Sequence, residues 1–324
     1  MRLFWLSLLT GFLFVGGGHA QSEPASFDEL RAVVEAVAVH LETDYVDAEP
    51  AGRRAARQLR ADFSAGVFEA AGDGEAFAAL ISARMQALTG DGHLNVEFSP
   101  EPIADGQPAK DAFDQAQMER WYGPHINYGV QSVQRLAGNV GYLDLRVFAP
   151  IDMGGDTVAA AMTVLADMDA LIIDLRHNGG GIGAMADLVA SYLFAPERQP
   201  LTGIYDGPTG RLTQAFTQPY VPGKRFGGEK PVYVLISQNT FSAAEALAYN
   251  LQVLERAKIV GEPSGGGAHP FEYVPITPHF VLWSVTAKSV NPITGGNWQT
   301  VGVQPDIIVT SDDALDRALA EITG

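Results

Sequence analysis

The sequence contains no cysteine, and its 324 residues include only 21 lysines and arginines against 38 aspartates and glutamates. The missing cysteine excludes disulfides, thiolate metal sites and a cysteine nucleophile together. The formal charge of −17 argues against nucleic acid and against an anionic membrane surface as partners, because both require clustered basic side chains. With 47% hydrophobic and 18% charged residues, the chain has a globular composition, enough for about two domains.

Long hydrophobic runs are also missing after the first 20 residues, MRLFWLSLLTGFLFVGGGHA, which have the pattern of a secretion signal. Arg2 precedes an apolar run from Leu3 to Val15, and small residues lead to Ala20. The run is shorter than the ~20 residues that a membrane-spanning helix needs. The sequence therefore predicts cleavage after Ala20, export to the periplasm or the extracellular space, and no stable membrane insertion of the mature chain.

The rest of the chain is predicted to form a helical part over residues 21–110 and an α/β part over 111–324. Helical spacing of apolar residues indicates three N-terminal helices, followed by a strand and a polar linker at 100–120. Farther along, strands alternate with helices, which is typical of an α/β domain. The predicted helices cover 26–45, 51–63, 75–89, 156–168, 183–194, 242–254 and 312–322, and the predicted strands cover 93–98, 170–175, 231–236, 257–260, 271–276, 281–286 and 307–309, with a hairpin turning at Gly138-Asn139.

A glycine-rich loop, DLRHNGGGIGA at 174–184, follows one predicted buried strand and precedes a helix. Glycines let a backbone approach a ligand and direct several N–H groups at one atom, although the same residues can form a plain turn. The spacing Gly179-x-Gly181-x-x-Ala184 also fits a dinucleotide-binding fingerprint. We disfavour that interpretation because polar residues 176–178 separate the strand from the glycines.

A second loop places Ser242 where the strand PVYVLI has ended and a helix begins. A serine there can be a helix N-cap, or it can be a nucleophile at the positive end of the helix. In the second case the N–H of Ala243 would point at the same space, and a glycine N–H from 179–181 could complete an oxyanion hole. The chain has no G-x-S-x-G, so the serine does not belong to the usual hydrolase elbow.

A serine nucleophile needs a base, and spacing alone does not choose among the histidines. His93 precedes an alternating strand, and His269 lies in a second glycine-rich loop. His177 borders the first glycine loop, whereas His40 has a structural position within a helix. No HExxH and no histidine pair at ligand spacing occur, so we expect neither a metal nor another cofactor.

Several stretches together resemble the S41 family of serine peptidases, the tail-specific or C-terminal processing proteases. The likeness is greatest to the branch that contains the interphotoreceptor retinoid-binding protein and the Tricorn core protease. The stretches occur in the family's order and cover most of 91–309. They are DGHLNV (91–96), LIIDLRHNGGG (171–181), VYVLISQNTFSAAEALAYNL (232–251), IVGEPSGGGAHP (259–270) and NPITGGNWQTVGVQPDIIV (291–309).

This resemblance implies a ClpP/crotonase-like α/β core behind an N-terminal helical bundle. It also implies that Ser242 is the nucleophile and that the N–H groups of Ala243 and Gly180 form the oxyanion hole. His93 matches the histidine base of the Tricorn-like branch. The lysine of the family's Ser–Lys branch is replaced by Gly267, which moves the role of base to His93, with His269 as the fallback.

Two further positions depart from the Tricorn-like pattern. Gln299 stands in the region where relatives carry glutamate, and Gly92 replaces the serine that precedes the histidine. A neutral amide such as Gln299 can orient an imidazole but stabilises an imidazolium less than a carboxylate does. Asp91 is near enough in sequence to substitute as the orienting group.

The predicted activity is therefore that of an exported serine peptidase acting on peptides or unfolded proteins. Only about 30 residues separate the strand at 93–98 from the hairpin, too few for a PDZ domain, so preference for a substrate's C-terminus is not implied. The alternatives are a weakly catalytic or non-catalytic protein that binds an apolar ligand, and an inactive adaptor of the cell envelope. A histidine base works when neutral, so His93 with its ordinary pKa would lose activity below roughly pH 6.5.

Overall fold

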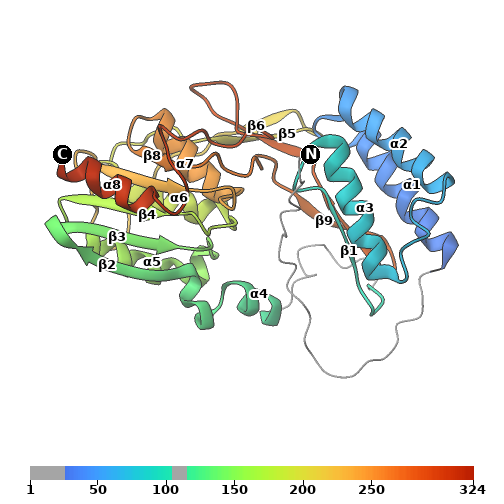
Figure 1. The fold of residues 1–324 in the computed structure, drawn as a ribbon, viewed down its shortest axis with the longest axis horizontal. Helices are drawn as coiled ribbons and strands as arrows, with labels where there is room; N and C mark the ends of the chain where they lie inside the picture. The colour runs from blue at the N-terminus through green and yellow to red at the C-terminus, as the bar shows by residue number, and fades with distance from the viewer. Residues whose placement is uncertain (1–25, 104–114) are drawn as a thin grey trace.

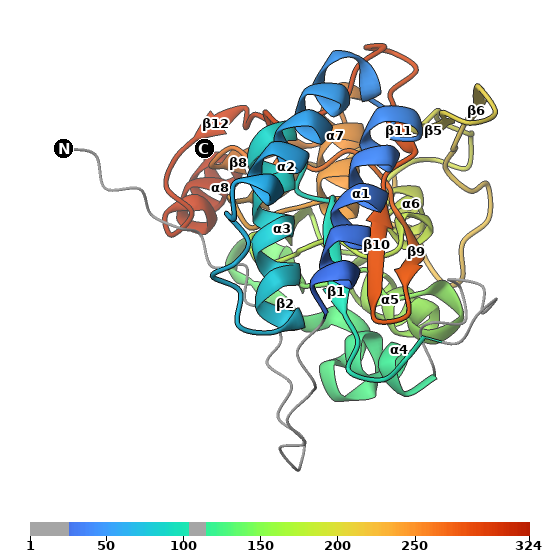
Figure 2. The same cartoon turned by 90° about the vertical axis from the view of Figure 1, so that its right-hand side faces the viewer.

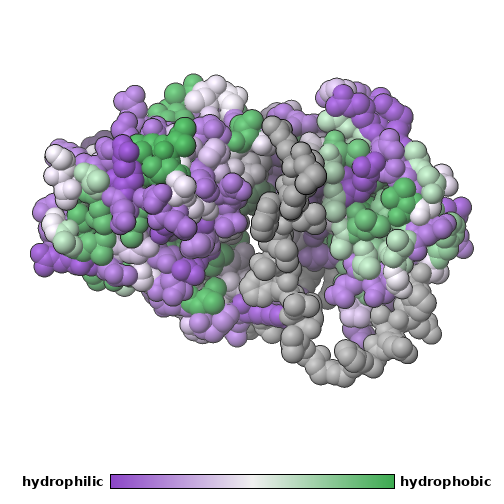
Figure 3. All heavy atoms as spheres, in the orientation of Figure 1, coloured by the Kyte–Doolittle hydropathy of each residue, from purple (hydrophilic) through white to green (hydrophobic). Residues whose placement is uncertain are grey.

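A computed structural model of the chain describes residues 26–103 and 115–324. The predicted secretion signal at 1–20 lies outside these residues. Within them, none of the helices combines the length and the apolar character that crossing a membrane requires. Hydrophilic side chains cover much of the face seen in Figure 3, and hydrophobic residues occur there in small groups.

Three helices form the N-terminal unit as predicted: α1 (Phe27–Thr43), α2 (Arg53–Ser64) and α3 (Gly74–Thr89). Their ends follow local rules. The Ser26 hydroxyl accepts the N–H of Glu29 at 3.1 Å, which caps α1. Gly90 ends α3 in the left-handed region, at φ 74°. A single turn of π-helix, η1 (Ala48–Gly52), leads into α2.

The N-terminal unit includes strands from a distant part of the chain. β1 (Asn95–Phe98) pairs antiparallel with β10 (Phe280–Ser284), which pairs in turn with β9 (Glu272–Thr277). In Figure 2, α1 to α3 lie in front of these strands. Phe77 of α3 contacts Phe280 edge to face, with ring centroids 5.8 Å apart. The unit predicted to end at residue 110 therefore also takes up the hairpin at 272–284.

A six-stranded sheet forms the centre of the second unit, in the order β12-β8-β7-β4-β3-β2. Its neighbouring strands are parallel except for the β2–β3 hairpin, which turns at Gly138-Asn139 as predicted. The two units lie at opposite ends of the view in Figure 1. The strands are β2 (Val130–Leu136), β3 (Val140–Leu145), β4 (Ala170–Asp174), β7 (Val232–Ile236), β8 (Lys258–Gly261) and β12 (Ile307–Ile308).

Helices cover both faces of this sheet, which explains why its central strands read as continuous apolar runs. On β4, Leu171 and Ile173 pack into the core shared with three helices, whereas Ile172 packs into the core of α8 (Ala314–Thr323) on the other face. The three helices are α5 (Ile151–Leu165), α6 (Gly183–Tyr192) and α7 (Ala243–Val253).

The structure also contains elements that the sequence did not predict. Helix α4 (Gln115–Tyr122) occupies the end of the expected linker, and a 3-10 segment, η3 (Pro124–Gly129), joins it to β2. A small antiparallel sheet joins β5 (Gly203–Asp206), β6 (Arg211–Thr213) and β11 (Ala287–Val290). β5 and β6 form a short local hairpin, and their third strand, β11, comes from more than 80 positions farther along the chain, so local pattern gives little sign of this sheet.

Candidate active site

Two loops meet at the carboxyl edge of the six-stranded sheet because β4 and β7 are adjacent and parallel. Three hydrogen bonds join the loops. The N–H of Phe241 donates to the Asn178 carbonyl at 3.0 Å, the Thr240 hydroxyl to the Leu175 carbonyl at 2.8 Å, and the Ser237 hydroxyl to the Arg176 carbonyl at 2.6 Å. The glycine loop and the serine loop therefore form one rigid surface.

Ser242 occupies the turn between this surface and α7 with a strained backbone, at φ 55° and ψ −119°. Such a conformation costs about 1–3 kcal/mol for a residue with a side chain and occurs mainly at functional sites. It is the conformation of a nucleophile elbow without the G-x-S-x-G sequence. A Cβ added at Gly180 would lie 2.8 Å from the Ser242 Cβ, so only glycine permits this close approach.

The two predicted oxyanion donors, Ala243 and Gly180, both lie close to Ser242. Ala243 is the first residue of α7, so its N–H is one of those that the helix leaves unpaired. The Gly180 N–H donates to Asn178 Oδ1 at 2.8 Å, and Asn178 is itself fully buried and donates to the Leu145 carbonyl at 2.9 Å. Gly180 therefore lies beside Ser242, and Asn178 Oδ1 accepts its N–H in this structure.

Glu245 is a fully buried carboxylate that the sequence analysis did not single out. Its Oε2 accepts the N–H groups of Ser242 and Gly267, both at 2.8 Å, and its Oε1 accepts the Ser264 hydroxyl at 2.6 Å and the Gly266 N–H at 2.7 Å. Burial raises the pKa of Glu245, and these four bonds offset only part of that rise. The side chain holds Ser242 and the loop at 264–267 in fixed positions.

His93 comes from the N-terminal unit and lies directly against the serine loop. Its ring packs at a tilt against Phe241, with centroids 4.7 Å apart, and against Phe271, with centroids 5.7 Å apart. Both ring nitrogens are buried and, among the described residues, have no hydrogen-bond partner. Burial lowers the pKa of His93 to about 4, and the nearby charge of Asp91 offsets part of that shift. No hydrogen bond joins His93 to Ser242, so their closest link is Phe241, the residue before the serine.

Asp91 connects the two candidate histidines. His269 Nδ1 lies 2.6 Å from Asp91 Oδ2, and His93 Nδ1 lies 3.8 Å from Asp91 Oδ1. The Tyr45 hydroxyl and the backbone N–H of His93 also donate to this fully buried carboxylate, both at 3.0 Å. Burial acts to raise the pKa of Asp91, but the bond to His269 and these further contacts hold it below its usual range. Asp91 therefore stays ionised between two imidazoles.

Gln299 lies in a different place from the one its predicted role requires. Its Oε1 accepts the Ala268 N–H at 2.6 Å, and its buried Nε2 has no partner among the described residues. It makes no hydrogen bond to either histidine. Gln299 therefore fixes the glycine-rich loop beside His269, while Asp91 contacts both imidazoles.

Gly267 shows why no lysine stands at this position. A Cβ there would lie 2.6 Å from Cε1 of His93 and would also overlap the Phe241 ring. The two aromatic rings fill the space into which a longer side chain would extend. The imidazole of His93 thus occupies the room that a lysine at 267 would need.

Three residues of the site escaped the sequence analysis: Phe241, Glu245 and Tyr45. Glu245 had a detectable signal, since it is a charged residue on the face of α7 that carries Ala244 and Ala248 into the core. Phe241 and Tyr45 had none, because their roles depend on contacts with residues more than 40 positions away. Of the other histidines, His40 is buried against β10 as expected, and His177 is exposed.

Comparison with known proteins finds matches to one peptidase family and to several of its members. The sequence model of peptidase family S41 matches residues 139–309. The chain is 29% identical over 188 residues to a carboxy-terminal-processing protease of Bartonella bacilliformis, covering 54% of this chain and 40% of that protein. It is 33% identical over 130 residues to a carboxyl-terminal-processing protease of Synechocystis, covering 40% and 28%. The chain spans less than half the length of these relatives.

Solved structures share the fold over most of the chain. A protein from Parabacteroides merdae aligns with a TM-score of 0.62 at 18% identity, covering 91% of this chain and 97% of that one. The tricorn protease aligns with a TM-score of 0.54 at 12% identity, covering 91% of this chain and 36% of that one. The predicted fold class, an α/β core with an N-terminal helical part, is confirmed.

Proposed function

The chain belongs to peptidase family S41, and from this premise we propose that it is a serine peptidase that cleaves peptides or unfolded proteins after export. Ser242 would attack the peptide carbonyl while the Nε2 of His93 takes its proton, because Nδ1 faces Asp91. The protonated His93 would then transfer this proton to the leaving amine, and water would release the acyl-enzyme by the same route. The strained conformation of Ser242 beside Gly180 is the observation that carries this proposal.

The oxyanion formed in this reaction would lie at the start of α7. The Ala243 N–H is one proposed donor, and the N–H of Gly180 is the other. Gly180 would share its hydrogen between the oxyanion and Asn178 in a three-centre bond, an arrangement that is common at helix termini. Two backbone donors beside a developing negative charge usually supply much of the rate enhancement in acyl transfer.

Asp91 is the proposed carboxylate partner of the base. A buried carboxylate can stabilise the imidazolium that forms on His93, which the amide of Gln299 does less well. The 3.8 Å between His93 Nδ1 and Asp91 Oδ1 is longer than a hydrogen bond, but catalytic bonds often tighten only when substrate binds. His269 would hold Asp91 in place from its other side, at 2.6 Å.

The direct test of this proposal is reaction with a peptidyl phosphonate, which labels an activated serine covalently. We expect residues 21–324 to digest an unfolded protein and to lose that activity as the label appears on Ser242 by mass spectrometry. An exposed serine should carry no label. Digestion without labelling of Ser242 would refute the assignment of the nucleophile. Labelling elsewhere would move the nucleophile to the labelled residue.

The dependence of activity on pH should differ from that of an ordinary histidine base. Since burial lowers the pKa of His93 to about 4, its neutral form dominates throughout pH 5 to 8. We therefore expect kcat/KM for a substrate without basic residues to be flat from pH 5 to 8 and to fall only near pH 4. This replaces the expectation of a fall below roughly pH 6.5. A midpoint near 6.5 would show that His93 is solvated or that another group is the base.

Binding of an apolar ligand is the second candidate function, and the unbonded pair Ser242 and His93 is the observation in its favour. A cavity between α6, α7 and the β5–β6 hairpin measures about 240 Å³. That is below the roughly 300–1,000 Å³ of pockets that enclose drug-sized molecules. The cavity therefore favours a single side chain over a whole lipid. Stoichiometric uptake of a fluorescent lipid, without digestion of any peptide, would favour ligand binding over peptidase activity.

A further inference from the structure

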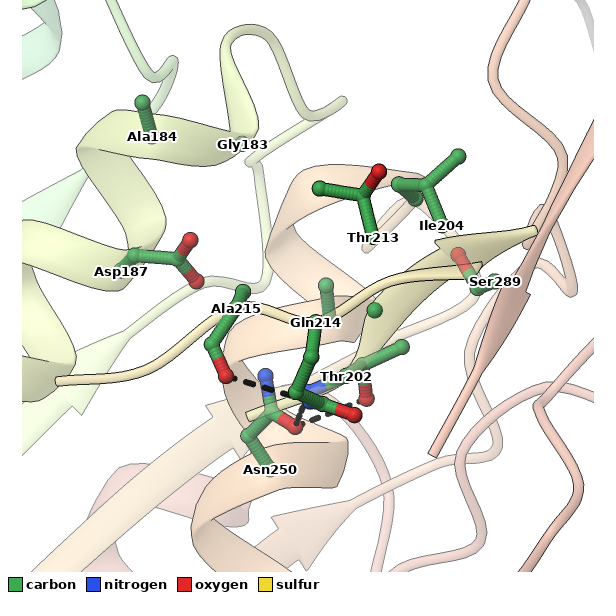
Figure 4. A pocket seen from close by; sticks show the side chains of 12 residues that line it. Gly183, Ala184, Asp187, Thr202, Ile204, Thr213, Gln214, Ala215, Asn250 and Ser289 are labelled. Atoms are coloured by element: carbon green, nitrogen blue, oxygen red, sulfur yellow. Dashed lines mark hydrogen bonds between the residues drawn. The ribbon is translucent and has the colours of Figure 1, made fainter. Parts of the chain in front are cut away.

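The cavity of about 240 Å³ opens between α6, α7 and the β5–β6 hairpin, and none of the residues with a proposed catalytic role lines it. Figure 4 shows the residues that line it. Ala246 on its wall lies one helical turn after Ser242, about 6 Å along α7. Gly183 and Ala184 follow directly on the glycine loop whose Gly180 touches Ser242. The cavity therefore begins about one helical turn from the proposed nucleophile, within reach of a substrate side chain near the scissile bond.

The two amide side chains of the cavity wall already have hydrogen-bond partners within the protein. Small residues such as Ala184 and Ala246 create its space. Asn250 Oδ1 accepts both the N–H and the hydroxyl of Thr202 at 2.8 Å, and Gln214 Nε2 donates to the Ala215 carbonyl at 3.1 Å. These polar groups have little capacity left for a ligand.

Asp187 is the exception. Figure 4 shows its side chain extending from α6 toward Ala215, across the cavity. Among residues 26–103 and 115–324, no side chain or backbone N–H forms a hydrogen bond or an ion pair with its carboxylate. Burial raises the pKa of Asp187 to about 7, and no other titratable residue lines the cavity. A partly buried carboxylate without a partner is unfavourable, so the site would gain from a bound cation.

Resting on the peptidase function proposed above, we propose that this cavity receives a lysine or arginine side chain of the substrate beside the cleaved bond. Asp187 would pair with the charged end of that side chain, and the alanines would contact its methylene groups. The volume suits one such side chain, and the net charge of −17 attracts cationic peptides in general. Asp187 is then the residue that sets the preference for basic substrates.

Matched peptides that carry lysine or norleucine at each position around the cleaved bond test this proposal. We expect wild-type protein at pH 8 to prefer lysine at one position by about tenfold or more in kcat/KM. Asp187→Asn should bring that ratio close to one, because an amide offers no charge to the lysine side chain. Asp156→Asn, which changes an exposed aspartate of α5, is the matched control and should keep the preference. An equal preference in Asp187→Asn and wild type would overturn the proposal.

Two further measurements separate this proposal from the peptidase function. The first is binding of the same peptides to Ser242→Ala, which needs no catalysis. If this variant prefers the lysine peptide but wild type cleaves no peptide, the peptidase function alone is refuted. Cleavage without any lysine preference would refute the role of Asp187 alone. The ratio should also fall from pH 8 to pH 5.5, because Asp187 becomes protonated below its raised pKa.

Stability gives an independent check on the unpaired charge. The folded-state pKa of Asp187 lies above its unfolded value, so its charge destabilises the fold progressively from about pH 4 to pH 7. Asp187→Asn should therefore raise Tm at pH 8 and leave it unchanged at pH 4. If Asp187→Asn and wild type have the same Tm at pH 8 as well as at pH 4, Asp187 is solvated and the proposal is overturned.

Discussion

Ser242→Ala is expected to lower kcat/KM for peptide cleavage by about 10⁴-fold or more, and His93→Ala by a similar factor. Removing the nucleophile leaves the base with nothing to activate, and removing the base leaves a hydroxyl that is a weak nucleophile. Because the two residues act as one unit, the double variant should retain the same residual rate as either single variant. Steady-state kinetics with one fluorogenic peptide measures all three.

The controls for this prediction are His177→Ala, which removes an exposed imidazole beside the glycine loop, and Ser132→Ala, which changes a serine of β2. Both should keep wild-type kinetics. Ser242→Ala should also keep the wild-type Tm, because alanine meets the same backbone strain as serine. Ser242→Gly should be more stable, since glycine adopts a φ of 55° without strain. Losses in the two single variants that add up in the double variant would show that Ser242 and His93 act independently.

Asp91→Asn is expected to lower kcat/KM by about 10³-fold, because an amide removes the charge that stabilises a protonated His93. The same change leaves His269 without its 2.6 Å carboxylate partner, so we also expect a lower Tm. Kinetics measured well below that Tm isolates the catalytic effect. Circular dichroism at the assay temperature checks that the variant is folded.

Gln299→Ala distinguishes the two candidates for the orienting group. If Asp91 orients the base, Gln299→Ala should cost less than about tenfold, since Gln299 holds only the Ala268 N–H. Asp47→Asn is a second control, because it removes a partly exposed carboxylate 3.6 Å from His269 Nε2. It should also cost less than about tenfold. A loss in Gln299→Ala as large as that in Asp91→Asn would move the orienting role back to Gln299.

Much of the fold could be predicted because its signals are local. Ser26 caps α1 and Gly90 ends α3 by rules that involve a few neighbouring residues. The apolar runs of β4 and β7 reflect burial on both faces of the sheet. The pairing of β1 with β10 joins residues nearly 190 positions apart, and such pairing leaves no local trace. The sequence therefore places the hairpin at 272–284 in the α/β part, whereas the folded chain packs it with the N-terminal helices.

The candidate site shows the same division between local and long-range signals. Ser242 and the glycine loop could be identified because both follow predicted strands. The contact between Asp91 and His269 spans 178 positions, so only the folded chain shows that one carboxylate serves two histidines. The strain at Ser242 had no sequence signal at all, since serine is an ordinary N-cap residue.

The crowding around Gly267 has a consequence for how such a protein can evolve. Exchange of the histidine base for a lysine at 267 requires that both His93 and Phe241 first give up their places. A lysine acquired first at 267 would overlap the rings of His93 and Phe241, and loss of the imidazole first would remove the proposed base. Selection would favour neither intermediate. A histidine base at 93 and a lysine base at 267 are therefore not connected by single substitutions that keep the function.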